Sequence, residues 1–116
     1  MMQAAVIVLV LAAIGGLTLA AIRLSGKPWP PTWMALGHGA VAATGVGLLF
    51  YAAVSPGIPT LAQVALGIFI LAALGGATLF LGFHMRNRAL PVPLVLAHGL
   101  IAATGLALLL VSYFQG

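Results

Sequence analysis

Four apolar stretches fill most of this chain, and each is long enough to cross a bilayer as a helix. They cover residues 3–22, 32–54, 59–83 and 93–114, and a crossing needs about 20 apolar residues. Only 3% of the 116 residues are charged, against 64% hydrophobic, which is too little charge for a soluble domain. Because lipid offers no partners to backbone N–H and C=O groups, we expect an all-α bundle of four transmembrane helices, forming one integral membrane domain over residues 1–116.

The composition also excludes several kinds of chemistry. The chain contains no Asp, Glu or Cys. Proton pumps and cation exporters usually place a carboxylate in the membrane, so its absence argues against them, and it excludes carboxylate acid–base pairs and Mg²⁺ or Ca²⁺ sites. Without Cys there is no disulfide, thiolate metal site, iron–sulfur cluster or Cys nucleophile. The composition decides neither for nor against an enzyme.

The positive charges are all in two connecting segments. The first and third connections carry Arg23, Lys27, Arg86 and Arg88, and the middle connection has none. The positive-inside rule therefore predicts a multi-pass protein of the bacterial inner membrane with both termini outside the cytoplasm. Topology explains the net charge of +4, so we expect no nucleic-acid partner. Basic residues follow the first apolar run rather than precede it, so we expect that run to be a retained span and not a cleaved signal peptide.

The two halves of the chain resemble each other. Residues 1–56 align without a gap over residues 61–116, and rare residue types coincide. The best matching blocks are Ala-Ala-x-Gly-Gly-x-Thr-Leu, starting at Ala12 and Ala72, and His-Gly-x-x-Ala-Ala-Thr-Gly, starting at His38 and His98. Each half contains an even number of crossings. We therefore expect two tandem helical hairpins related by a pseudo-two-fold axis along the membrane normal.

Two histidines occupy equivalent positions in the second and fourth stretches. His38 lies about six residues, or about 9 Å, inside the start of its stretch, and His98 is its copy. An ionisable side chain within the membrane is costly and is a functional candidate by default. Two imidazoles that face each other across a bundle can be the axial ligands of a haem. We interpret His38 and His98 as ligands of the iron of one haem b.

Small residues share or neighbour this layer. A flat macrocycle needs small neighbours, and the candidates for contact with the cofactor are Gly16, Gly76, Gly45 and Gly105. Thr18 or Thr78 would accept the Nδ1 hydrogen bond that orients each imidazole. Rows of small residues predict the faces where helices approach closely. These rows are Ala12-Gly16-Ala20, Gly39-Ala43-Gly47 and Gly99-Ala103-Ala107.

The same residues allow other interpretations. Neutral His38 and His98, hydrogen-bonded across helix interfaces to Thr78 and Thr18, would suit a non-catalytic accessory subunit of a larger membrane complex without a cofactor. Each histidine alone would also suit a (bacterio)chlorophyll, which takes one axial ligand. His84 has no copy in the first half. We expect it at the membrane interface near a helix C-terminus, as a structural residue, with a haem ligand or a hydrogen-bond donor to a quinone as the alternatives.

These motifs carry two resemblances. Gly-Gly-x-x-Leu, followed in the next stretch by Pro and Leu-x-His-Gly-x-x-Ala-Ala-Thr-Gly, resembles small uncharacterised bacterial four-helix membrane proteins over nearly the whole chain and implies no activity. The helix number and histidine placement are similar to those of bis-His membrane b-type cytochromes. That similarity implies electron transfer with quinol or a partner protein. Those cytochromes often carry two haems with four ligands, whereas the three histidines of this chain, all on one side, allow one haem b at most. We also expect assembly in a larger membrane complex or a homo-oligomer.

The charge asymmetry generates a topological prediction. A reporter that is active only outside the cytoplasm should be active when it is fused after Gly116, because both termini are expected outside. The matched fusion in the first connection, after Gly26, should be inactive. Activity of a cytoplasm-only reporter at the C-terminal position would overturn the assignment.

Overall fold

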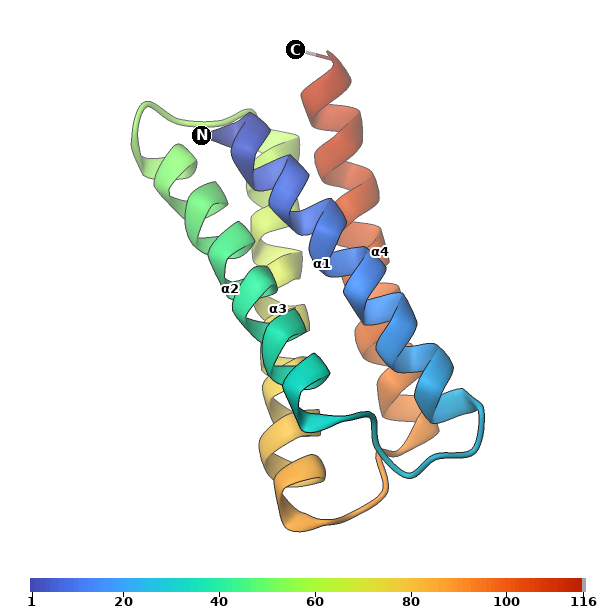
Figure 1. Cartoon of the computed structure of the whole chain (residues 1–116). Helices are drawn as coiled ribbons and strands as arrows, with labels where there is room; N and C mark the ends of the chain where they lie inside the picture. Colours follow the sequence, from blue (N-terminus) through green and yellow to red (C-terminus); the bar gives the residue numbers. More distant parts are fainter. Residues whose placement is uncertain (116) are drawn as a thin grey trace.

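The computed structural model of the chain describes residues 1–115 and is all-α (Figure 1). Gly116, the last residue of the second predicted repeat, lies outside the described residues. The four helices are each long and apolar enough to cross a membrane. They are α1 (Met2–Leu24), α2 (Thr32–Val54), α3 (Thr60–Gly82) and α4 (Val92–Gln115), with a short 3₁₀ turn, η1 (His84–Arg86), after α3.

Proline residues mark where three of the helices begin. Pro31 and Pro59 are the caps that precede α2 and α3, and Pro91 directly precedes α4. Proline is tolerated there because the first N–H groups of a helix have no partner within it. The connections turn at Gly26 and Gly57, whose positive φ angles of 110° and 126° are readily adopted by glycine alone. The predicted spans are thus confirmed to within about two residues at each end.

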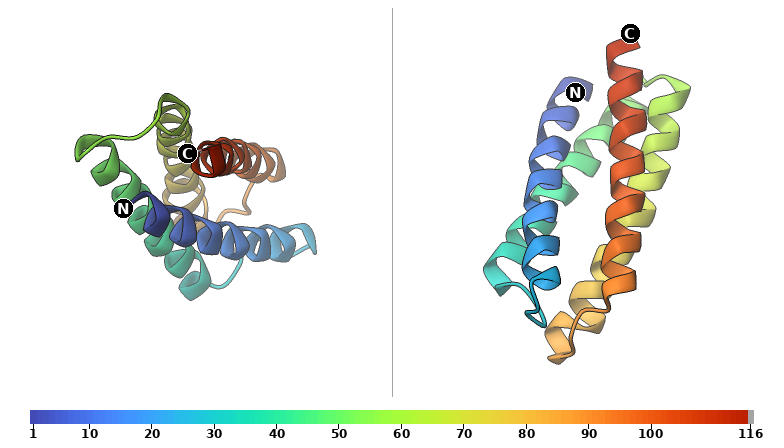
Figure 2. Two further views of the ribbon diagram at one scale, coloured as in Figure 1. Left: turned by 90° about the horizontal axis from the view of Figure 1, so that it is seen from above. Right: turned by 90° about the vertical axis from the view of Figure 1, so that its right-hand side faces the viewer.

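Helices that follow one another in sequence lie side by side. α1 packs on α2 and α3 packs on α4, so the chain forms two hairpins, and α1·α4 and α2·α3 contacts join them. Both termini lie at one end of the bundle, and the first and third connections lie at the other (Figures 1 and 2). Within residues 1–115, the diagonal pairs α1–α3 and α2–α4 have no Cα atoms within 8 Å of each other.

Two apolar clusters hold the bundle, one toward each end. The larger cluster lies toward the termini and includes Leu9, Leu49, Phe69 and Leu109. A smaller cluster near the first and third connections contains Leu79, Leu90 and Val95. His38 and His98 fall between the two along the helices. The layer that carries the histidines is therefore flanked by close-packed apolar side chains on both sides.

Hydrogen bonds tie the first connection to the third. The Arg23 side chain donates from Nε to the Leu90 carbonyl at 2.8 Å, and from Nη1 to the Lys27 carbonyl at 3.3 Å. The Leu90 N–H donates in turn to the Pro28 carbonyl at 3.0 Å. These bonds join the two hairpins at the end opposite the termini.

The structure corrects two of the three predicted contact faces. Gly39 and Gly47 on α2 and Gly99 on α4 are exposed, and a Cβ added to any of them would meet nothing within 4 Å. The rows that contain them face outward, so the prediction that they join helices within this chain is wrong. The row on α1 does face inward, since Ala12 is buried and Gly16 contacts the His38 ring.

Other glycines make the close approach within each hairpin. A Cβ on Gly45 would lie 2.7 Å from Leu9 Cγ and 3.3 Å from Val8 Cγ1. A Cβ on Gly105 would lie 3.2 Å from Ile68 Cγ2 and 3.3 Å from two ring carbons of Phe69. Both glycines are buried. They allow α2 to approach α1, and α4 to approach α3, in the apolar half of each hairpin.

These contacts rank the effects of glycine substitutions on stability. Gly45→Ala should destabilise the protein by about 1–3 kcal/mol, because the new methyl group overlaps the branch point of Leu9. Gly105→Ala should cost less, since its neighbours are farther away, and Gly39→Ala should change little. Thermal unfolding of the three variants in detergent tests this order. A loss at Gly39 as large as that at Gly45 would contradict the packing described.

Candidate functional site

Each of the two matched histidines is held by a backbone carbonyl of its own hairpin. His38 Nδ1 lies 2.9 Å from the carbonyl oxygen of Ala12 on α1, and His98 Nδ1 lies 2.8 Å from that of Ala72 on α3. A carbonyl only accepts hydrogen bonds, so Nδ1 must carry the proton in both rings. In a neutral imidazole, Nε2 is then an unprotonated atom with an available lone pair.

Paired glycines allow this bond to form. In a helix, a side chain covers the turn that precedes its own Cα, so side chains at positions 15 and 16 would lie over the Ala12 carbonyl. Glycine at both leaves room for the ring: a Cβ on Gly16 would lie 3.0 Å from His38 Cε1, and one on Gly15 would lie 3.7 Å from Nδ1. In the second hairpin, a Cβ on Gly76 would lie 3.1 Å from His98 Cε1. Two of the four glycines predicted near the cofactor, Gly16 and Gly76, thus lie against the imidazoles.

The two imidazoles meet across the α2–α4 diagonal. Their ring centroids are 6.4 Å apart and their planes are inclined at 87°. The backbones of α2 and α4 do not approach within 8 Å within residues 1–115, so the histidines approach each other across that gap. Neither Nε2 has a hydrogen-bond partner in that part of the chain. In both imidazoles, the lone pair of Nε2 is therefore available to a hydrogen-bond donor or to a metal.

The predicted threonine partners are not the acceptors. Thr18 Oγ1 donates to the Ile14 carbonyl at 3.0 Å, and Thr78 Oγ1 donates to the Leu74 carbonyl at 2.8 Å. A threonine hydroxyl in a helix commonly bonds to the carbonyl four residues before it, and both side chains are exposed here. The histidines do make interhelical hydrogen bonds, as the accessory-subunit interpretation expected, but to carbonyl oxygens.

Gly45 and Gly105 lie two helical turns beyond the histidines. Their nearest side chains are Leu9 and Phe69, respectively, so the structure gives each a role in helix packing. Their contact with a cofactor stays a prediction. The structure does bring together Gly16 with His38, Gly76 with His98, and the two histidines with each other.

His84 is separate from this pair and more buried than expected. It is 6% exposed, and its Nε2 lies 3.0 Å from Thr32 Oγ1 at the start of α2. Its ring centroid is 5.0 Å from that of Phe80 and 6.3 Å from that of Trp29. His84 therefore links the end of α3 to the other hairpin, which supports the structural interpretation of this residue.

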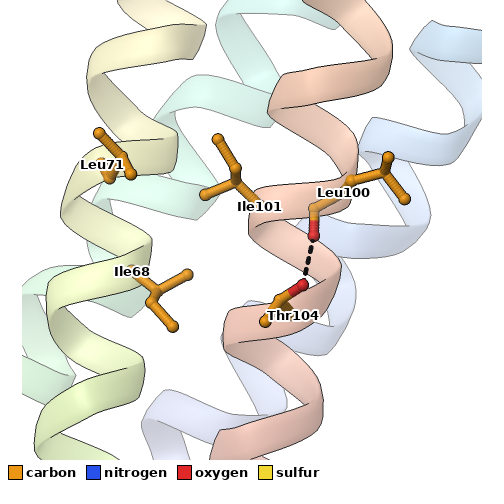
Figure 3. Close-up of a pocket in the computed structure, with 5 residues that line it drawn as sticks. All are labelled: Ile68, Leu71, Leu100, Ile101 and Thr104. Carbon is orange, nitrogen blue, oxygen red and sulfur yellow. Dashed lines mark hydrogen bonds between the residues drawn. The ribbon is translucent and has the colours of Figure 1, made fainter.

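Two shallow grooves open on the outer surface, at equivalent positions in the two hairpins. One has a volume of about 260 Å³, and Figure 3 shows the Thr104 hydroxyl in it bonded to the Leu100 carbonyl; its lining is Ile68, Leu71, Leu100, Ile101 and Thr104. The other, of about 320 Å³, is lined by Val8, Leu11, Ala40, Val41 and Thr44. Neither contains a histidine, and both offer mainly van der Waals contact to lipid.

Sequence reasoning missed the residues that orient the imidazoles. Ala12 and Ala72 act through backbone oxygens, which every residue has, so their identity carries no direct signal. The nearest signal is the recurrence of Ala-Ala-x-Gly-Gly in both halves together with the histidines. The two glycines mark a carbonyl that lacks a covering side chain.

The tautomer of each histidine is open to measurement. Nitrogen-15 NMR of the full chain should show Nδ1 protonated and Nε2 unprotonated in both His38 and His98. Gly16→Ala should perturb the His38 signals alone, because the new methyl group would lie 3.0 Å from Cε1. The matched control is Gly15→Ala, whose Cβ makes only ordinary contact. Protonation at Nε2 in the unmodified protein would contradict the hydrogen bonds described.

Comparison with known proteins leaves this geometry as the basis for any assignment. No family model matches the chain, and no curated protein or solved structure matches it. The chain itself has four helices of membrane-spanning length and interhelical hydrogen bonds from two histidines.

Proposed function

We propose that this chain is a small membrane b-type cytochrome, or the haem-bearing subunit of a redox complex, with His38 and His98 as the axial ligands of one haem b. The observation that carries the proposal is the pair of imidazoles 6.4 Å apart, each held through Nδ1 by a carbonyl. Metal-binding histidines usually donate the other ring N–H to a carbonyl or carboxylate, which fixes the tautomer and the ring orientation.

The ring separation supports ligation of a single metal. Both imidazoles could hold one metal only if the two rings lie close together. The His38 and His98 centroids are 6.4 Å apart, and each ring has one nitrogen, Nε2, that would be available to the metal.

The donor set favours an iron that brings its own equatorial ligands. A bare Zn²⁺ site needs three or four protein ligands, and no group of three His, Cys, Asp or Glu residues suited to a metal occurs in residues 1–115. Two imidazoles complete the coordination only where the other positions are already filled, as in a haem. When bound, this group would supply one-electron redox chemistry.

The proposal includes the arrangement of the hairpins in the membrane. The bonds His38–Ala12 and His98–Ala72 join equivalent positions, which supports two tandem copies related by a pseudo-two-fold axis along the membrane normal. We place the protein in the bacterial inner membrane with its termini outside the cytoplasm, as the charge distribution favours. The histidine layer then lies nearer the cytoplasmic face, and quinol or a partner protein on that side would exchange electrons with it.

The outward-facing rows of small residues favour a second candidate function. Gly39, Ala43 and Gly47 on α2, and Gly99, Ala103 and Ala107 on α4, are all exposed. Such rows are typical of close helix contacts in membranes. They support assembly with other helices, so the alternative is an accessory subunit of a larger complex in which the histidines serve only as interhelical hydrogen-bond donors.

An absorption spectrum separates the two candidates. The protein purified from a haem-sufficient host should show a Soret band and the sharp reduced bands of a six-coordinate, bis-imidazole iron. His38→Gly and His98→Gly should each remove this spectrum or convert it to that of a high-spin iron with one histidine ligand, since the other ligand is lost. External imidazole should restore it, because the small ligand can occupy the space of the missing ring.

The matched control is His84→Gly, which removes a third histidine that is separate from the pair. This variant should keep the spectrum even where it loses some thermal stability. Circular dichroism checks that the helices persist in all three variants. A colourless, fully helical protein would sink the cytochrome proposal and favour the accessory subunit, whereas extraction of a magnesium tetrapyrrole would identify a (bacterio)chlorophyll instead.

A further inference from the structure

The end of the bundle opposite the termini carries all of the side-chain positive charge. Arg23, Lys27, Arg86 and Arg88 are the only Lys and Arg residues of the chain, which has no Asp or Glu to neutralise them. Lys27, Arg86 and Arg88 are exposed and Arg23 is half-buried. This end is therefore strongly cationic, and it attracts anionic groups from outside the chain.

The hydrogen bonds between the two connections gather these charges on one surface. Arg23 reaches the Leu90 carbonyl, two residues beyond Arg88, while the Leu90 N–H reaches Pro28, next to Lys27. The guanidinium carbon of Arg88 also lies 5.9 Å from the centroid of the Phe83 ring, within the range of a cation–π contact. Neither the Lys27 nor the Arg86 side chain makes a hydrogen bond within residues 1–115, and both are exposed, so these two cations are available to an external anion.

Large apolar side chains are exposed at the same end. Leu24 is 53% exposed, Met85 is 58% exposed and Trp33 is 75% exposed. Leu24 precedes the first connection, Met85 lies beside Arg86, and Trp33 lies in the first turn of α2. Exposed apolar chains interleaved with cations suit the lipid interface, where tryptophan sits at the level of the headgroups.

We infer that this cationic end binds the headgroups of anionic phospholipids, with Lys27 and Arg86 as the principal phosphate contacts, Trp33 at the level of the headgroups, and Leu24 and Met85 among the upper acyl chains. The chemistry agrees with the orientation proposed above, because anionic lipids give the cytoplasmic leaflet a negative surface potential. The inference does not depend on a haem. It rests on charge, exposure and the joined connections.

Intrinsic tryptophan fluorescence reports on this surface. Its only two tryptophans, Trp29 and Trp33, lie in and just after the first connection. The full chain is reconstituted in phosphatidylcholine vesicles that contain 20% phosphatidylglycerol, with bromine on the acyl chains of either one lipid or the other. At equal bromine content, brominated phosphatidylglycerol should quench the tryptophan fluorescence more strongly, and added salt should reduce the difference.

Charge variants test the named contacts. Lys27→Gln with Arg86→Gln should lower the preference for phosphatidylglycerol by up to about fivefold per charge removed. The matched control, Lys27→Arg with Arg86→Lys, should retain it. Inorganic phosphate at equal ionic strength should act no more strongly than chloride, which separates a headgroup site from one for free phosphate. Equal quenching by the two brominated lipids would overturn the inference and leave an acidic protein as the partner of this end.

Discussion

The arrangement of the histidine layer depends on two hydrogen bonds, from His38 Nδ1 to the Ala12 carbonyl and from His98 Nδ1 to the Ala72 carbonyl. Each bond satisfies a polar group that would be costly to leave unpaired in lipid, and fixes which nitrogen keeps a lone pair. Each also requires a helix surface without side chains over the carbonyl, which Gly15 and Gly16 provide on α1. The glycine pair, the imidazole and its unpaired Nε2 thus form one structural unit. This unit occurs once in each hairpin.

The number, bounds and hairpin order of the helices could be predicted from the sequence, because hydropathy and proline positions record them directly. The inward faces of α2 and α4 could not. These helices are apolar on all sides, so no polar face marks the outside, and the row at Gly39 was indistinguishable from the true contact at Gly45. The histidine layer could be predicted from matched positions. The hydrogen-bond acceptors of the two histidines could not be predicted, because every residue has a backbone carbonyl oxygen and its use leaves no signal in the sequence.

Two polar residues without a polar copy lie at the cytoplasmic end proposed above. Arg23 has Phe83 at the matching position of the second hairpin, and His84 has Leu24 at the matching position of the first. Arg23 bonds across to Leu90 and His84 bonds across to Thr32. Both unmatched polar residues therefore link one hairpin to the other, whereas the matched histidines bond within their own. Arg23 and His84, which have no copy, therefore help to join the hairpins, whereas the matched histidines form the layer between them.

This division has a mechanical consequence. Each imidazole is hydrogen-bonded within its own hairpin, so the 6.4 Å between the ring centroids spans the contact between the two hairpins. The hydrogen bonds to Leu90 and Thr32 join the hairpins at one end of the bundle, and the apolar cluster around Leu49 and Leu109 joins them toward the other. A small change in the angle between the hairpins would alter the spacing of the rings before it disturbed either hydrogen bond.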